Sequence, residues 1–125
     1  MSRRVLIVED QDDLRDILRL ALEGAGYTVF EAANGRQGVE MVAAKRPDLV
    51  LMDIQMPVLD GYDATREIKA CPDLSQTPVI AISSYAMKGD EEKALAAGCD
   101  DYVTKPYSPR ALLAKVRRHL DDKEK

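Results

Sequence analysis

The chain alternates short apolar runs with segments of helical periodicity five times, and this alternation constrains the fold more than any other feature. Alternating strands and helices predict an α/β domain whose parallel sheet carries helices on both faces. The predicted strands are Arg4–Val8, Tyr27–Glu31, Leu49–Asp53, Pro78–Ser83 and Asp101–Thr104. The predicted helices cover residues 12–24, 35–46, 61–70, 89–97 and 108–120.

Composition narrows the class of protein. A chain of 125 residues suits one core, so we expect residues 1–125 to form one domain without an output domain. No apolar run approaches the roughly 20 residues of a membrane span, and no signal-peptide pattern opens the chain, so we expect a cytoplasmic protein. A net charge of −4 argues against broad nucleic-acid binding. Cys71 and Cys99 fit no metal or redox spacing, and His119 is expected at a helix end or surface.

Polar side chains lie where the predicted strands end. The run Leu49–Asp53 passes through four apolar residues into a carboxylate. Because ligands of open parallel sheets bind outside the carboxyl ends of the strands, we expect Asp53 at the floor of a site. The residues expected at this edge are Glu9, Asp10, Asp53, Ser83 and Lys105.

This set of side chains suits phosphoryl transfer. Clustered carboxylates repel one another, and a hard cation such as Mg²⁺ relieves that repulsion, with a carbonyl near Gln55 as one more oxygen ligand. Asp53 can attack phosphorus, while Lys105 and Ser83 contact the transferred oxygens. Taken singly, each of these residues also fits a helix cap, a turn or a solvated surface.

Four stretches together make the sequence closely resemble the receiver domain of two-component response regulators. The resemblance implies a doubly wound, five-stranded parallel sheet of order 2-1-3-4-5 flanked by five helices, the flavodoxin-like receiver fold. It extends over essentially the whole chain. The matching stretches are Val5–Asp10 (VLIVED), Leu49–Gly61 (LVLMDIQMPVLDG), Pro78–Ser83 (PVIAIS) and Tyr102–Pro106 (YVTKP).

The resemblance also implies roles at the acidic centre. Asp53 matches the phosphoacceptor, and Glu9 and Asp10 match the acidic pair that holds Mg²⁺. Gln55 matches a residue whose main-chain carbonyl coordinates the metal, and its side chain falls at a position that tunes dephosphorylation. Lys105 matches the lysine that contacts the phosphoryl group.

Further roles follow from the same resemblance. Ser83 matches the hydroxyl switch residue, and Tyr102 matches its aromatic counterpart. Ser84 stands where a small residue adjoins the phosphoryl group. Tyr85 lies at a second position that tunes dephosphorylation, and Pro106 matches a proline that usually follows a cis peptide bond.

The expected function is a phosphorylation-controlled switch. A histidine kinase or histidine phosphotransfer protein would donate the phosphoryl group to Asp53, and a surface of the fourth helix, fifth strand and fifth helix would contact a downstream protein. The chain would catalyse only its own phosphorylation and dephosphorylation, as a monomer or a weak phosphorylation-dependent dimer, without contact to nucleic acid or membrane. One alternative is a constitutive protein-binding module. Another is an aspartate-nucleophile phosphohydrolase, which Gln55 disfavours because it occupies the position of the usual general acid.

Overall fold

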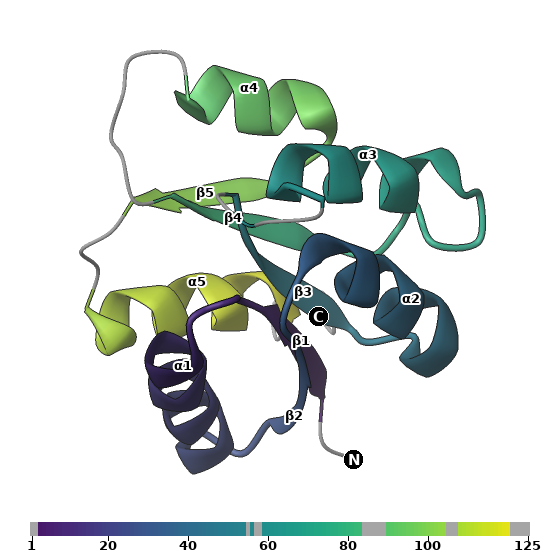
Figure 1. Ribbon diagram of the computed structural model, residues 1–125. Helices are drawn as coiled ribbons and strands as arrows, with labels where there is room; N and C mark the ends of the chain where they lie inside the picture. The colour runs from purple at the N-terminus through teal and green to yellow at the C-terminus, as the bar shows by residue number, and fades with distance from the viewer. Residues whose placement is uncertain (1–2, 55, 57–58, 84–89, 105–107, 121–125) are drawn as a thin grey trace.

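The computed structural model describes residues 3–54, 56, 59–83, 90–104 and 108–120, and strands and helices alternate along them as expected (Figure 1). The strands are β1 (Arg4–Val8), β2 (Thr28–Ala32), β3 (Leu49–Asp53), β4 (Val79–Ser83) and β5 (Asp101–Thr104). The helices are α1 (Asp12–Gly24), α2 (Gly35–Lys45), α3 (Gly61–Ala70), α4 (Asp90–Ala97) and α5 (Pro109–Leu120).

The five strands form one parallel sheet in the order β2-β1-β3-β4-β5, which confirms the expected topology. The central strand β3 pairs with β1 on one side and β4 on the other. Val8 lies opposite Met52, and Asp53 lies opposite Ile82. The carboxyl ends of β1, β3 and β4 therefore meet at one edge of the sheet.

The two faces of the sheet are covered by different helices, with α1 and α5 on one face and α2, α3 and α4 on the other (Figure 1). Successive strand residues point to opposite faces, so neighbours in one strand belong to different halves of the core. In β3, Leu49 and Leu51 pack toward α1 and α5, whereas Val50 and Met52 pack toward α2 and α3. Burial on both faces explains why the central strands are apolar without polar alternation.

The boundaries of two strands differ from the sequence prediction by one residue. β2 begins at Thr28 because the main-chain N–H of Tyr27 donates to the Leu22 carbonyl at the end of α1. β4 begins at Val79 because Pro78 has no N–H to donate, although its carbonyl accepts from Val50 N at 2.9 Å. β2 also ends one residue later than predicted, at Ala32 instead of Glu31, but the last residues of β1, β3 and β4 are those predicted.

Other expectations concern single residues. Ser108 lies at the start of the predicted last helix and caps α5, accepting a hydrogen bond from Ala111 N at 3.0 Å. Both cysteines are free thiols, Cys71 half-buried and Cys99 buried. His119 does lie in the last turn of α5, but it is largely buried and contacts β5. Across the described part of the chain, no helix has the length and apolar character that crossing a membrane requires.

Candidate functional site

Three carboxylates gather at the carboxyl edge of the sheet. Glu9 and Asp10 follow β1, and Asp53 is the last residue of β3. One carboxylate oxygen from each lies within 4.8 Å of the others. Glu9 is 1% exposed and Asp53 is 3% exposed, so two of the three lie on the floor of the site. The expectation that strand ends would bring these acids together is confirmed.

The main chain that follows Asp53 is held tightly. Ile54 N donates to the Ile82 carbonyl at 2.9 Å, and Gly61 N donates to the Ile54 carbonyl at 2.9 Å. A Cβ atom on Gly61 would lie 2.4 Å from the Asp53 carbonyl oxygen, closer than atoms can approach. Glycine at this position therefore lets α3 begin directly against the end of β3.

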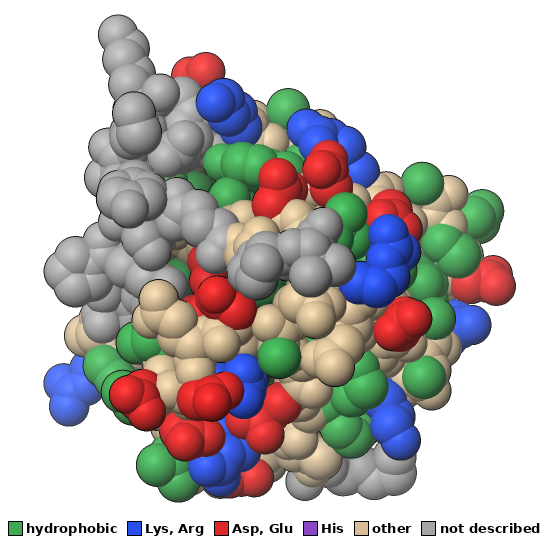
Figure 2. All heavy atoms as spheres, in the orientation of Figure 1, with side chains coloured by type: hydrophobic (Ala, Val, Ile, Leu, Met, Phe, Trp, Pro, Cys, Tyr) green, Lys and Arg blue, Asp and Glu red, His purple; other side chains and the backbone are tan. Residues whose placement is uncertain are grey.

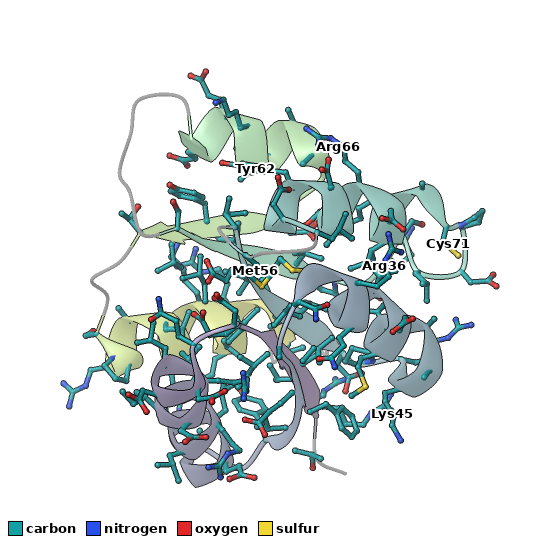
Figure 3. All side chains as sticks on the ribbon, in the orientation of Figure 1. Arg36, Lys45, Met56, Tyr62, Arg66 and Cys71 are labelled. Carbon is teal, nitrogen blue, oxygen red and sulfur yellow. The ribbon has the colours of Figure 1, made fainter. Side chains whose placement is uncertain are left out.

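α2 lies close to Leu59, just before α3, and is also linked to α3. A Cβ atom on Gly35, at the start of α2, would lie 2.0 Å from the Leu59 carbonyl oxygen, so Leu59 lies directly against α2. Arg36 belongs to α2, and its side chain reaches toward α3 (Figure 3), where its guanidinium donates two hydrogen bonds to Glu67 at 2.8 and 2.9 Å. These contacts hold Leu59 and α3 against α2.

β4 and β5 bring two more predicted residues near this edge. Ser83 ends β4 and is fully buried, one residue beyond the pairing of Asp53 with Ile82. Tyr102 lies in β5, half-buried, and packs against the part of the core that faces α2, α3 and α4. The remaining residues expected at the site lie outside the described part of the chain: Gln55, Ser84, Tyr85, Lys105 and Pro106.

The side chains present fit a hard divalent cation. Mg²⁺ prefers oxygen ligands and is bound in proteins by one or two carboxylates together with waters. Glu9, Asp10 and Asp53 offer carboxylate oxygens at one point, which matches that preference in kind and in position.

Hydrogen bonds to both the main chain and the side chain hold Glu9. Its N–H donates to the Ala32 carbonyl at 3.0 Å, and its carboxylate accepts from Gln11 N at 3.2 Å. Its carbonyl accepts from Arg15 Nη1 at 2.8 Å. Sequence reasoning missed Arg15, because an arginine three residues after Asp12 looks like half of an ordinary helical ion pair.

A second charged cluster, also missed, joins β5 to α5. Asp101 accepts from Lys115 Nζ at 3.0 Å and lies 3.1 Å from His119 Nε2. Burial raises the pKa of the Asp101 carboxyl, but hydrogen bonds from Lys115, His119 and the Tyr102 N–H outweigh it and hold the pKa below its ordinary value. No sequence motif marks this cluster, since its members are 14 and 18 residues apart.

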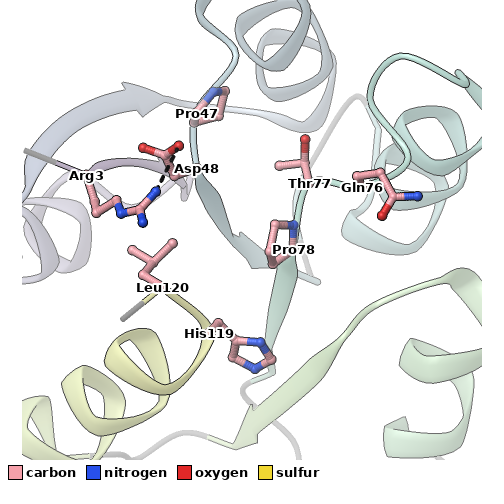
Figure 4. A pocket seen from close by; sticks show the side chains of 8 residues that line it. All are labelled: Arg3, Pro47, Asp48, Gln76, Thr77, Pro78, His119 and Leu120. Carbon is pink, nitrogen blue, oxygen red and sulfur yellow. Dashed lines mark ion pairs between the residues drawn. The ribbon is translucent and has the colours of Figure 1, made fainter. Parts of the chain in front are cut away.

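A hollow at the opposite edge of the sheet has a different character (Figure 4). It has a volume of about 270 Å³ and lies beside the amino ends of β1, β3 and β4. Arg3 and Asp48 form an ion pair there at 4.0 Å, and Arg4 N donates to Asp48 at 2.8 Å. Charges of opposite sign meet at this edge, so the acidic edge is the better candidate for a cation site.

Comparison with known proteins identifies the family. Residues 5–117 match the model of the response regulator receiver domain. The polar-differentiation response regulator DivK of Brucella anthropi is 37% identical over 122 residues, which cover 98% of this chain and 99% of that protein.

Solved structures agree with this match. The receiver domain of a sensor histidine kinase from Pseudomonas aeruginosa, with a magnesium ion coordinated in its active-site cleft, is 37% identical, with a TM-score of 0.90 over 97% of this chain and 99% of that one. The chemotaxis response regulator CheY4 of Vibrio cholerae is 27% identical, with a TM-score of 0.90 over 96% of this chain and 100% of that one. The chain therefore belongs to the response regulator receiver domains of two-component signalling.

Proposed function

We propose that Asp53 accepts a phosphoryl group from a histidine kinase or a histidine phosphotransfer protein. The observation that carries this proposal is the meeting of Glu9, Asp10 and Asp53, with carboxylate oxygens within 4.8 Å, at the carboxyl edge of a parallel sheet. Membership of the receiver family supports it. Ligand sites of doubly wound sheets are typically located at this edge.

In the proposed reaction, a carboxylate oxygen of Asp53 forms a bond to phosphorus while the bond from phosphorus to the donor imidazole nitrogen breaks. The electron pair of that bond leaves with the imidazole, and the product is an aspartyl phosphate. Ser83 and Ser84 donate hydrogen bonds to phosphoryl oxygens, and Lys105 offsets their charge.

Glu9, Asp10, Asp53 and the Gln55 carbonyl are the proposed Mg²⁺ ligands. When bound, Mg²⁺ supplies positive charge beside the oxygens of the group being transferred. The magnesium ion in the active-site cleft of the Pseudomonas receiver domain, 37% identical to this chain, supports this assignment.

The proposed output is a change in the surface that binds a downstream protein. Phosphorylation adds about −1.5 to −2 charges, which draw the Ser83 hydroxyl toward the phosphoryl group. Tyr102 then turns inward, and the surface formed by α4, β5 and α5 changes its affinity for a downstream protein. To reverse the populations of the inactive and active states almost completely, phosphorylation must stabilise the active state over the inactive one by roughly 5.5 kcal/mol. Gln55 and Tyr85 set the lifetime of the phosphoryl group, and the chain turns over no separate substrate.

The test is the intact mass of the protein after incubation with acetyl phosphate and Mg²⁺, with Asp53→Asn as the matched variant. We expect one phosphoryl group on the parent protein and none on Asp53→Asn. The parent protein should also gain none when Mg²⁺ is chelated during the incubation. Beryllofluoride, which mimics the bound phosphoryl group, should shift the NMR signals of Tyr102 and α4. If the folded parent protein gains no mass and shows no beryllofluoride response, it is a constitutive binding module instead.

A further inference from the structure

Arg15 connects the first turn of α1 to the end of β1. Helical side chains tilt toward the helix N-terminus, and the Arg15 guanidinium accordingly reaches back to the Glu9 carbonyl, with Nη1 at 2.8 Å. Its Nη2 lies 2.6 Å from Asp12 Oδ1, and its Nε lies 3.6 Å from Glu31 Oε1. The side chain is only 17% exposed, and its guanidinium contacts the residue after β1, the first turn of α1 and β2.

The carbonyl that Arg15 binds belongs to the peptide that joins Glu9 to Asp10. Because a peptide unit is planar, fixing this carbonyl also fixes the direction in which the chain enters Asp10. The Glu9 N–H is held separately by the Ala32 carbonyl at 3.0 Å. Gln11, the N-cap of α1, makes no capping bond with its side chain, so Arg15 ties together a junction that lacks an ordinary side-chain cap.

We propose that Arg15 is a positioning residue for the Glu9–Asp10 pair and thereby sets the affinity of the site for Mg²⁺. The inference rests on the proposed Mg²⁺ site and adds a determinant to it. Hydrogen bonds that orient metal ligands typically change metal affinity by roughly 10–100-fold when they are lost. Arg15 contacts the ligand residue through its main chain, so we expect an effect at the lower end of that range.

The sign of the effect separates positioning from simple electrostatics. A guanidinium near the site repels a divalent cation. If Arg15 acted through its charge alone, replacing it with a neutral residue would tighten Mg²⁺ binding. If Arg15 acts by holding the Glu9 carbonyl, the same replacement weakens Mg²⁺ binding.

Arg19 provides a matched control one helical turn further along α1. Its Nε lies 3.6 Å from the same Glu31 oxygen, the same separation as for Arg15. Its other partners among the described residues are Asp16 at 3.4 Å and Glu23 at 3.3 Å, both side-chain carboxylates. Figure 2 shows this mixture of acidic and basic side chains over α1. Arg19→Gln therefore makes the same charge change without loss of a bond to Glu9.

The experiment measures Mg²⁺ dissociation constants by isothermal titration calorimetry at constant ionic strength. We expect Arg15→Gln to bind Mg²⁺ roughly 10-fold more weakly than the parent protein, and Arg19→Gln to remain within about twofold. Arg15→Lys, which keeps the charge and one donor, should fall between them. A hollow of about 170 Å³ beside Arg15 leaves room for these side chains.

A second measurement separates positioning from general damage to the fold. The rate of phosphorylation by acetyl phosphate is followed as Mg²⁺ is raised. Arg15→Gln should need roughly 10-fold more Mg²⁺ for half its maximal rate, yet reach a maximum close to that of the parent protein. A damaged fold would instead lower the maximum at every Mg²⁺ concentration.

Two results would overturn the inference. One is an Arg15→Gln variant that binds Mg²⁺ as tightly as Arg19→Gln, or more tightly than the parent protein. The other is equal Mg²⁺ affinity of Arg15→Lys and Arg19→Lys. This pair is compared if Arg15→Gln does not fold. A parent protein that binds no Mg²⁺ would refute the proposed metal site itself, and the role of Arg15 with it.

Discussion

Two aspartates of the same sheet have opposite surroundings. Asp53 ends β3 beside the carboxylates of Glu9 and Asp10, within 4.8 Å. Asp101 begins β5 and accepts a hydrogen bond from Lys115 at 3.0 Å, with His119 Nε2 at 3.1 Å. Two other carboxylates lie close to the first aspartate, whereas Lys115 and His119 contact the second.

The contrast distinguishes a binding site from a structural contact. At an effective dielectric constant of about 20, two unit charges 4.8 Å apart repel by roughly 3 kcal/mol. A bound cation relieves this repulsion between the carboxylates. The pairing of Asp101 with Lys115 stabilises the fold without any ligand. Replacing Asp53 with a neutral residue should therefore raise the stability of the protein, and replacing Asp101 should lower it.

The largest expected effect comes from disturbing the main chain behind Asp53. Gly61→Ala places a Cβ atom 2.4 Å from the Asp53 carbonyl oxygen, so backbone must move. We expect it to lower the free energy of unfolding by about 2–3 kcal/mol and to reduce phosphorylation by acetyl phosphate. Urea denaturation measures the first effect and intact mass the second.

Gly24→Ala is the control for that variant. A Cβ atom on Gly24 meets nothing within 4 Å, and the residue lies in α1, where alanine is the better helix former. Gly24→Ala should therefore leave stability unchanged or raise it by up to about 1 kcal/mol. A Gly61→Ala variant as stable as Gly24→Ala would show that the chain behind Asp53 is not held closely.

Neutralising Asp53 should stabilise the protein. Asp53→Asn removes one of three clustered carboxylates, so we expect the free energy of unfolding without Mg²⁺ to rise by about 1–2 kcal/mol. With Mg²⁺ present, the parent protein gains stability by binding it and the difference should shrink. Thermal denaturation with Mg²⁺ or with chelator measures both quantities, and a loss of stability in chelator would contradict the repulsion.

Neutralising Asp101 should destabilise the protein, which is the opposite of the effect expected at Asp53. Asp101→Asn keeps an oxygen for the Tyr102 N–H but loses the charge that pairs with Lys115. Because Lys115 is 32% exposed, we expect a loss of about 1 kcal/mol, with or without Mg²⁺. A double-mutant cycle with Lys115→Met isolates the pair, and a coupling energy of zero would show that the contact contributes nothing.

The smallest expected effect is the pH dependence of the stability that Asp101→Asn loses. The Asp101 pKa is lower in the folded protein than its ordinary value of 3.8, so its contribution is fully present above that value. It disappears as the pH falls through the lower folded pKa, where the carboxyl becomes protonated. The stability difference between the parent protein and Asp101→Asn should thus be constant near neutral pH and shrink in acid. A difference that grows in acid would contradict this sign.

Much of the fold and the acidic centre could be predicted from local sequence. Apolar runs and helical periodicity predict strands and helices because each pattern reflects burial of one element. Glu9, Asp10 and Asp53 could be grouped because parallel strands all end at one edge of the sheet. The topology confirmed that grouping without any adjustment of the residues.

Contacts across elements could not be predicted in this way. Arg15 bonds to Glu9, and Gly61 lies against Asp53, through main-chain carbonyls, which carry no sequence signature. The partners of Asp101 lie on α5, and their meeting depends on how that helix packs on the sheet.

The sequence by itself therefore determined which elements form and which carboxylates share an edge, because these follow from periodicity and from strand direction. Only the tertiary structure decided how those carboxylates are held and which charges are compensated. The physical reason is that hydrogen bonds and ion pairs act over about 3–4 Å, and that precision is set by packing between elements distant in sequence.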